Sequence, residues 1–343
     1  MTTEHDAWLA SRIEASGIEA PIDPDLPICD PHHHLWARPG DTYLLPQVLQ
    51  DTRSGHRVVQ TVFVECDAGY RSGGPQALRP VGETEFVEAE TAGVGTARAI
   101  LAPVIAAGIV GFADLTLGDK VAAVLEAHMA ASPARFRGIR HRTPWDPSPE
   151  ISKPGGPPPG LLLDTRFRQG FACLPRYGLS FDAWLLHPQL MELMDLARAF
   201  PDVSIILDHV GGPLRIGPYA AQREAVFQAW KASIAALAGC PNVTVKLGGL
   251  GMHICGFGWD KQRVPPGSAE MAEAMAPYYL WCIERFGADR CMFESNFPVD
   301  KVSSSYVVLW NAFKRIAQGF SPRERAALFH DTAARVYRLT PRA

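Results

Sequence analysis

Short apolar, β-branched runs alternate with longer amphipathic segments along this chain. The runs predict eight strands, at residues 28–32, 58–65, 97–103, 136–140, 179–185, 203–208, 243–247 and 291–295. Helical patterns lie between and after them, at residues 83–91, 117–131, 188–199, 220–238, 268–286, 306–316 and 322–337. Strands that alternate with helices pair in parallel through right-handed crossovers. Eight such units predict an α/β fold, a (β/α)8 TIM barrel in one domain.

Two segments rich in proline and glycine interrupt this alternation. Residues 144–160 follow the fourth predicted strand, and residues 248–267, which include His253, Trp259 and Asp260, follow the seventh. Loops after barrel strands form the active-site face, so both segments are predicted to be pocket walls or lids, with surface insertions as the alternative. We expect an N-terminal extension at residues 1–25 and the barrel domain at 26–343.

Composition and charge narrow the class of partner. The chain is 47% hydrophobic and 20% charged, with a formal net charge of -3, so nothing indicates a basic surface for nucleic acid or an anionic membrane. Its longest apolar runs are too short to span a bilayer. Seven cysteines without a CxxC pair favour the cytoplasm. We therefore expect a small-molecule ligand, and a homodimer to which exposed Trp8 or Trp310 could contribute.

The first predicted strand ends in three consecutive histidines followed by Leu35 and Trp36. Side chains two positions apart on a strand share a face, so His32 and His34 point the same way and His33 points the opposite way. Two converging imidazoles suit a divalent metal, a polarised carbonyl or a water molecule. The alternatives are a histidine-rich turn, or rings that bond to the backbone at a strand end.

Polar residues end other predicted strands too. His209 follows the sixth strand at a Gly-Gly turn and is expected at the barrel mouth, with an N-cap or core histidine as the alternative. Asp208 has the opposite parity and is expected to face the helix layer. On the fourth strand, Arg140 and Arg142 share one face and His141 the other, so either the pair or His141 faces the pocket. Guanidinium groups would suit an acidic substrate, with a surface ion pair as the alternative.

Lys246 and Glu294 lie on the last two predicted strands with matching parity. A charge inside a barrel needs a partner, because burying it alone costs several kcal/mol. We therefore predict that these two side chains point inward and pair. The pair could be structural, or Glu294 could be a ligand or a proton acceptor.

With these residues in hand, the sequence resembles the amidohydrolase superfamily, specifically its amidohydrolase-related (amidohydrolase 2) family of metal-dependent TIM-barrel hydrolases. Relatives include lactonases that act on sugar lactones and on pyrone dicarboxylate. The motifs that carry the resemblance are DPHHHLW at 30–36, FVECDAG at 63–69, RGIRHR at 137–142, LDHVGGP at 207–213, VKLGGLGM at 245–252 and MFESNFPVD at 292–300.

The resemblance implies that His32, His34, His209 and an aspartate after the eighth strand activate water or bind one divalent ion, zinc being the favoured one. This sequence departs at the last position, where Asn296 replaces the aspartate. Asparagine cannot act as a base and is a weak ligand. Either Glu294 or another carboxylate such as Glu65 takes the role, or the centre is metal-free, or the chemistry has changed.

The expected function is a hydrolase that opens a lactone or similar cyclic ester of a small carboxylated substrate with activated water. The expected catalytic residues are His32, His34, His209, Glu294 and Asn296, the first three also being the expected metal ligands. The expected substrate-binding residues are Trp36, Glu65, Arg140, His141, Arg142, His187 and Lys246. The alternatives are a metal-dependent non-oxidative decarboxylase and a non-catalytic ligand-binding barrel.

Overall fold

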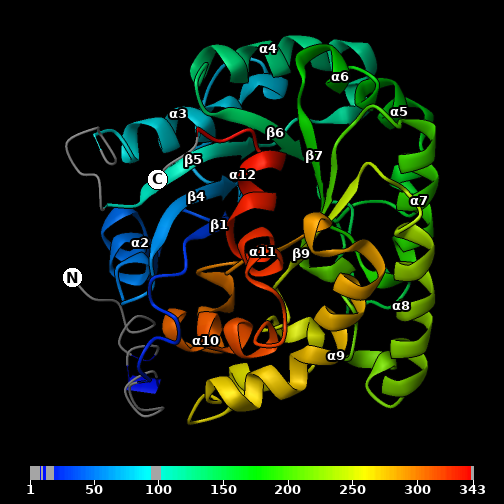
Figure 1. Cartoon of the computed structure of the whole chain (residues 1–343). Helices are drawn as coiled ribbons and strands as arrows, with labels where there is room; N and C mark the ends of the chain where they lie inside the picture. Colours follow the sequence, from blue (N-terminus) through cyan, green and yellow to red (C-terminus); the bar gives the residue numbers. More distant parts are fainter. Residues whose placement is uncertain (1–7, 9–10, 13–18, 94–101, 341–343) are drawn as a thin grey trace.

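Eight parallel strands form the centre of the molecule, in a computed structural model that describes residues 8, 11–12, 19–93 and 102–340 (Figure 1). In spatial order the strands are β1 (Ile28–His33), β4 (Val58–Val64), β5 (Val104–Gly111), β6 (Phe136–Arg140), β7 (Ser180–Ala183), β8 (Ile205–Leu207), β9 (Val243–Leu247) and β10 (Cys291–Phe293). A parallel bridge from His33 to Phe297, just past β10, joins the two edges. The fold is the predicted (β/α)8 barrel.

One predicted strand is misplaced. The third barrel strand is β5, which begins at Val104, whereas the pattern predicted residues 97–103. Residues 97–101 lie outside the described part of the chain, and Ala102 and Pro103 precede the strand. The Ala-Ala-Gly interior of β5 has weak strand preference, which hid the strand from its sequence. An unpredicted antiparallel pair, β2 (Trp36–Arg38) and β3 (Asp41–Tyr43), follows β1.

Helices surround the barrel (Figure 1). They are α2 (Leu45–Thr52), α3 (Val81–Glu90), α4 (Ala122–Ala131), α5 (Thr165–Phe171), α6 (Leu174–Tyr177), α7 (Leu190–Ala199), α8 (Arg223–Leu237), α9 (Ser268–Phe286), α10 (Tyr306–Ile316), α11 (Pro322–Ala326) and α12 (Thr332–Val336). The predicted bounds of α9 and α10 are confirmed. The helix predicted at 117–131 instead begins at Ala122, because Gly118 has a φ of 60° and interrupts the preceding 3-10 segment.

The barrel interior is apolar at one end and charged at the other. The C-terminal segment closes the apolar end, where α12 lies at the centre of the ring of strands (Figure 1). Tyr337 belongs to the same apolar cluster as Ala333 and Val336 of this helix. The strand side chains of this layer are Cys29, Val62, Val64, Val110, Ile206 and Met292. The Tyr337 hydroxyl donates to Asp182 Oδ2 at 2.6 Å, so the closing segment contacts the charged layer directly.

Both irregular segments lie where the sequence placed them, after β6 and after β9. The second contains two short 3-10 turns, His253–Cys255 and Trp259–Lys261. Arg12, from the N-terminal extension, donates to the carbonyl oxygens of Trp259 and Gln262 at 2.7 and 2.9 Å. The extension is therefore attached to the loop that follows β9.

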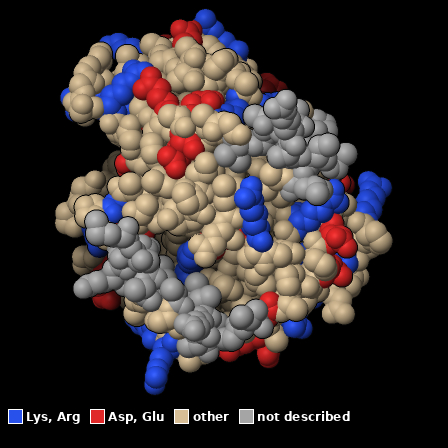
Figure 2. Space-filling model, turned by 90° about the vertical axis from the view of Figure 1, so that its left-hand side faces the viewer, with Lys and Arg blue, Asp and Glu red and all other residues tan. Residues whose placement is uncertain are grey.

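The described surface carries charged side chains of both signs and a few exposed apolar ones. On the face in Figure 2, basic and acidic side chains are interspersed. None of the helices in the described ranges is long and apolar enough to cross a membrane. Trp8 is exposed, but the expectation that Trp310 is exposed was wrong, because α10 buries it completely in the core. The homodimer stays a prediction.

Candidate active site

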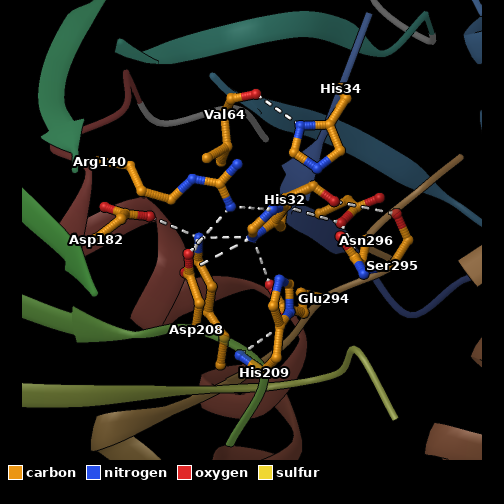
Figure 3. Close-up of polar contacts among 12 residues, drawn as sticks. His32, His34, Val64, Arg140, Asp182, Asp208, His209, Glu294, Ser295 and Asn296 are labelled. Carbon is orange, nitrogen blue, oxygen red and sulfur yellow. Dashed lines mark hydrogen bonds and ion pairs between the residues drawn. The ribbon is translucent and has the colours of Figure 1, made fainter. Parts of the chain in front are cut away.

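Three imidazole rings meet at the carboxyl end of the barrel. The His32 ring lies 4.9 Å from that of His34 and 4.6 Å from that of His209, measured between centroids (Figure 3). All three side chains are buried. His33 points the other way, as strand alternation requires, and its Nε2 lies 2.9 Å from Thr61 Oγ1. The predicted convergence of the three rings is present.

The turn after β8 corrects one expectation. Ile206 points into the barrel interior, so Asp208, two residues on, also points inward rather than toward the helices. Asp208 Oδ1 lies 3.0 Å from Lys246 Nζ. His209 reaches the mouth for a different reason: its φ of 54° turns the chain out of the strand. A side chain at Gly249 would clash with the His209 ring at 2.5 Å.

Glu294 fixes the orientation of two of the three histidines. Its Oε1 accepts from His209 Nδ1 at 2.7 Å and from the His209 backbone N–H at 3.1 Å, and its Oε2 lies 2.8 Å from His32 Nδ1. Burial alone would raise the pKa of Glu294, but His209 and His32 outweigh it and hold the pKa well below its usual range. Because an ionised carboxylate only accepts, Nδ1 carries the proton in both rings.

A carbonyl oxygen also only accepts hydrogen bonds. His34 Nδ1 lies 2.7 Å from the carbonyl oxygen of Val64, so this nitrogen carries the proton in His34 as well. Burial lowers the pKa of His32 to about 4 and holds the pKa of His34 well below its usual range, so both rings are neutral at pH 7. His32 and His34 thus have the proton on Nδ1 and an unprotonated Nε2, and the third ring, His209, donates from Nδ1 to Glu294. Nitrogen atoms in this state can bind a metal ion or accept a proton.

The Lys246 ammonium group lies next to the His32 ring. The prediction that Lys246 pairs with Glu294 was wrong. Its Nζ lies 2.7 Å from Asp182 Oδ2 and 3.0 Å from Asp208 Oδ1. Both predicted partners point inward, but His32 lies between them, with Nδ1 3.1 Å from Lys246 Nζ. Burial lowers the pKa of Lys246, but Asp182 and Asp208 outweigh this effect and raise it. Lys246 is therefore a fixed positive charge.

Strand parity left two alternatives on β6: either Arg140 and Arg142 or His141 faces the pocket. In the structure the two arginines face it. Glu65 Oε1 lies 2.8 Å from Arg140 Nε and 3.1 Å from Arg142 Nε. Arg140 Nη1 also lies 3.4 Å from both Asp208 Oδ2 and His32 Nε2, so this guanidinium is fully occupied. The Arg142 side chain remains 37% exposed and has more freedom to meet a ligand.

His141 has apolar surroundings, and its expected role in substrate binding stays a prediction. Its ring packs against Phe112 and Phe167, with centroids 5.1 and 5.3 Å away. Its Nδ1 accepts from the Leu115 N–H at 3.2 Å. The side chain points away from the barrel axis, because it alternates with Arg140 along β6.

Three further predicted residues have distinct surroundings. Trp36 stacks on His34 at 5.8 Å, and its buried Nε1 has no acceptor among the described residues. His187 packs edge-on against Tyr219 at 5.3 Å rather than against the three site histidines. Asn296 donates from its backbone N–H to the carbonyl oxygen of His32 at 3.0 Å, which joins β1 to the segment after β10.

A metal ion could be held by three of these residues. Ligand atoms of His32, Asp208 and His209 lie within 4.8 Å of one another. Two imidazole nitrogens and one carboxylate oxygen form a donor set that suits zinc. His34, an expected ligand, is outside this group, and Asp208 joins it.

The sequence analysis missed two carboxylates, Asp182 and Asp300, in addition to misplacing Asp208. Asp182 pairs in register with Arg140, so the inward parity of that arginine could have found it. Asp300 follows the last strand in a 3-10 turn, where alternation carries no information. It accepts from Asn296 Nδ2 at 2.9 Å and from the Gly251 N–H at 3.1 Å.

Comparison with known proteins agrees with this architecture. A family model described as amidohydrolase matches residues 29–339. The chain belongs to the amidohydrolase family. It is therefore a hydrolase, as the sequence motifs indicated.

Two curated relatives and one solved structure show how far the similarity extends. The uncharacterized protein y4mH of Sinorhizobium fredii is 37% identical, over 92% of this chain and 99% of its own length. An L-fucono-1,5-lactonase of Burkholderia ambifaria is 27% identical, over 90% of this chain and 95% of its own length. The crystal structure of an amidohydrolase from Burkholderia multivorans superposes with a TM-score of 0.69 at 22% identity, covering 91% of this chain and 99% of the other. A second crystal form of that protein contains bound zinc.

Proposed function

We propose that this hydrolase opens a lactone of a small carboxylated substrate by adding water to the ring carbonyl. The observation that carries the proposal is the convergence of three buried histidines, each oriented by an acceptor at Nδ1, next to the fixed positive charges of Arg140 and Lys246. The similarity to an L-fucono-1,5-lactonase supports the lactone as substrate class.

The proposed roles follow from the contacts of each side chain. Arg142 binds the substrate carboxylate, because its guanidinium is the more exposed of the two and can form a bidentate pair. Arg140, next to His32 Nε2, stabilises the negative charge that develops on the carbonyl oxygen through its fixed positive charge, because its own donors are already paired. Glu294 positions His32 and His209, and Trp36 forms an apolar wall beside His34.

His32, Asp208 and His209 fit a divalent ion and would hold it. Such an ion polarises a carbonyl and lowers the pKa of water toward ~7. Asp208 contributes a fully ionised ligand: burial alone would raise its pKa, but Lys246 and His32 outweigh this effect and hold the pKa well below its usual range.

The test is acid release from a panel of lactones, measured with a pH indicator on the purified enzyme. The panel contains aldono-1,5-lactones, carboxylated lactones and a simple aliphatic lactone. Wild type should open at least one carboxylated or sugar lactone, and His32→Ala should abolish turnover while the melting temperature stays within a few degrees. Turnover that survives in His32→Ala, or a panel without any substrate, would refute the proposal.

His33→Gln is the matched control, since this histidine belongs to the same triplet but points out of the site. Glutamine can keep the hydrogen bond to Thr61. We expect this variant to retain wild-type turnover.

We also infer a cytoplasmic location, which the seven free cysteines support.

A further inference from the structure

Lactone hydrolysis needs a group that accepts a proton from the attacking water. Three carboxylates interact electrostatically with His209 and so lie close to the reaction centre: Asp208, Glu294 and Asp300. Asp208 pairs with Lys246 and Arg140, and Glu294 accepts from both His32 and His209. These interactions stabilise the ionised forms of Asp208 and Glu294, so both are poor bases.

Asp300 differs from the other two in its partners. Its Oδ1 accepts from the Asn296 amide at 2.9 Å and its Oδ2 from the Gly251 N–H at 3.1 Å, both neutral donors. In the described part of the chain it has no salt-bridge partner. Burial without a cation favours the protonated form of a carboxyl group, so Asp300 binds a proton more readily than its two neighbours do.

The backbone of the loop after β9 passes close to this carboxylate. A side chain at Gly251 would come within 2.8 Å of Asp300 Oδ2, and one at Gly249 would come within 2.5 Å of the His209 ring. Both glycines belong to one short turn, so Asp300 and His209 face the same stretch of backbone. The carboxylate and the ring are buried to the same depth, with 2% and 3% of their surface exposed.

Two other buried carboxylates are less suitable. Glu65 is neutralised by Arg140 and Arg142. Asp30 accepts only from neutral groups, but one of its oxygens accepts from the Tyr306 hydroxyl of α10 at 2.9 Å, which places it toward the helix layer.

We propose that Asp300 is the general base of the lactonase reaction, a role that rests on the proposed function. Asp300 takes one proton from water while the water oxygen bonds to the lactone carbonyl carbon. The bond from that carbon to the ring oxygen then breaks, and the proton held by Asp300 passes to the departing alkoxide. One lactone and one water give one hydroxy acid, which at neutral pH releases its own proton to the solvent.

The electrostatic surroundings are consistent with this role. Burial raises the pKa of Asp300 to about 7, against the opposing effects of His209 and of the Asn296 and Gly251 hydrogen bonds. A base of this pKa is half ionised at neutral pH, where a general base works best. The titratable groups that face it are His209, Cys255, Tyr279 and Glu294.

The experiment compares Asp300→Asn and Asp300→Ser with wild type on a lactone that wild type opens, from pH 5 to 9. Serine removes the carboxylate with a smaller polar side chain, so it serves as the second variant if the first does not fold. Asp51→Asn is the matched control: it removes the 2.9 Å ion pair from Lys301 to Asp51, which loosens the same turn without touching Asp300.

We expect kcat to fall by roughly 100-fold or more in a folded Asp300 variant, with KM within about threefold, and the acid limb of the wild-type profile to disappear. Asp51→Asn should keep wild-type kcat. A folded Asp300 variant with kcat within about fivefold of wild type would overturn the role of Asp300 and leave the lactonase intact. A wild-type profile without an acid limb would also overturn it, even if neither variant folds. A wild type that opens no lactone would overturn both proposals.

Discussion

The position of Glu294 between two histidines leads to a sharp prediction for Glu294→Gln. The carboxylate accepts from His32 Nδ1 and from His209 Nδ1, one on each oxygen. A glutamine has one accepting oxygen and one donating nitrogen, so one of the two rings must meet a donor. That ring has to move its proton from Nδ1 to Nε2, and its unprotonated nitrogen at the mouth is lost.

The cost to stability and the cost to activity should be very different. Losing one hydrogen bond to a charged group costs about 1.5–3 kcal/mol. With an unfolding entropy of about 2.1 cal/mol/K per residue over 343 residues, this lowers the melting temperature by roughly 2–4 °C. A histidine held in the wrong tautomer can cost about 10⁴ in kcat, the effect known for the serine-protease triad. We therefore expect kcat to fall by roughly 10²–10⁴ in a protein that stays folded.

Glu83→Gln is the matched control for this variant. Glu83 is equally buried, and its Oε1 accepts from the N–H groups of Cys66 and Ala68 at 2.9 and 2.8 Å. Burial raises its pKa to about 8, so it is mostly protonated at pH 7 and glutamine is a close mimic. Differential scanning fluorimetry and steady-state lactone hydrolysis measure both variants. If Glu294→Gln kept kcat within about threefold of Glu83→Gln, the tautomer argument would be wrong.

Three further outcomes are expected. Gly249→Ala should lose activity and about 1–3 kcal/mol of stability. The new β-carbon would lie 2.5 Å from the His209 ring, and the φ of 70° at this position disfavours a side chain. Kinetics and thermal melts of the variant check this. Lys246→Met should lower the melting temperature by roughly 4–7 °C. The reason is that leaving Asp182 and Asp208 without their cation costs about 3–5 kcal/mol. Equal melting temperatures for wild type and variant would contradict this prediction. The melting temperature should also fall from pH 6.5 to 4.5, where the unfolded chain protonates histidines that the folded chain keeps neutral. The six with a pKa lowered to about 4 are His32, His33, His56, His128, His141 and His187. Together with His34, whose pKa burial also holds well below its usual range, they outnumber the six acids with a raised pKa, which act in the opposite direction: Asp30, Glu65, Glu83, Asp182, Glu192 and Asp300. A melting temperature that rises on acidification would contradict the prediction.

Strand alternation accounts for most of what the sequence could predict. A period of two placed Lys246 and Glu294 inside the barrel and separated His32 and His34 from His33. It could not name the partners, because the carboxylates that Lys246 contacts come from β7 and from the turn after β8, whose heights relative to β9 depend on barrel stagger.

Alternation fails where the chain leaves the strand. His209 was expected at the mouth and lies there, but through a left-handed turn and not through strand parity, which is why Asp208 was assigned to the wrong face. Asp300 has no periodic signal, since it lies in a 3-10 turn whose position depends on contacts with Gly251 and Asn296. The contact with Gly251 joins residues 49 apart in the sequence, so it becomes visible only in three dimensions.

The hydrogen bond between Asn296 and Asp300 gives a reason for the amide at position 296. Asn296 Nδ2 donates to Asp300 Oδ1 at 2.9 Å, so an aspartate at 296 would place two acceptors face to face. The pair would then have to share a proton, as adjacent carboxylates do, and the pKa of one member would rise further. An acid at 296 would therefore compete with Asp300 for one proton at neutral pH. On this reasoning, the amide does not mark a lost base: it is the donor that a base at position 300 requires.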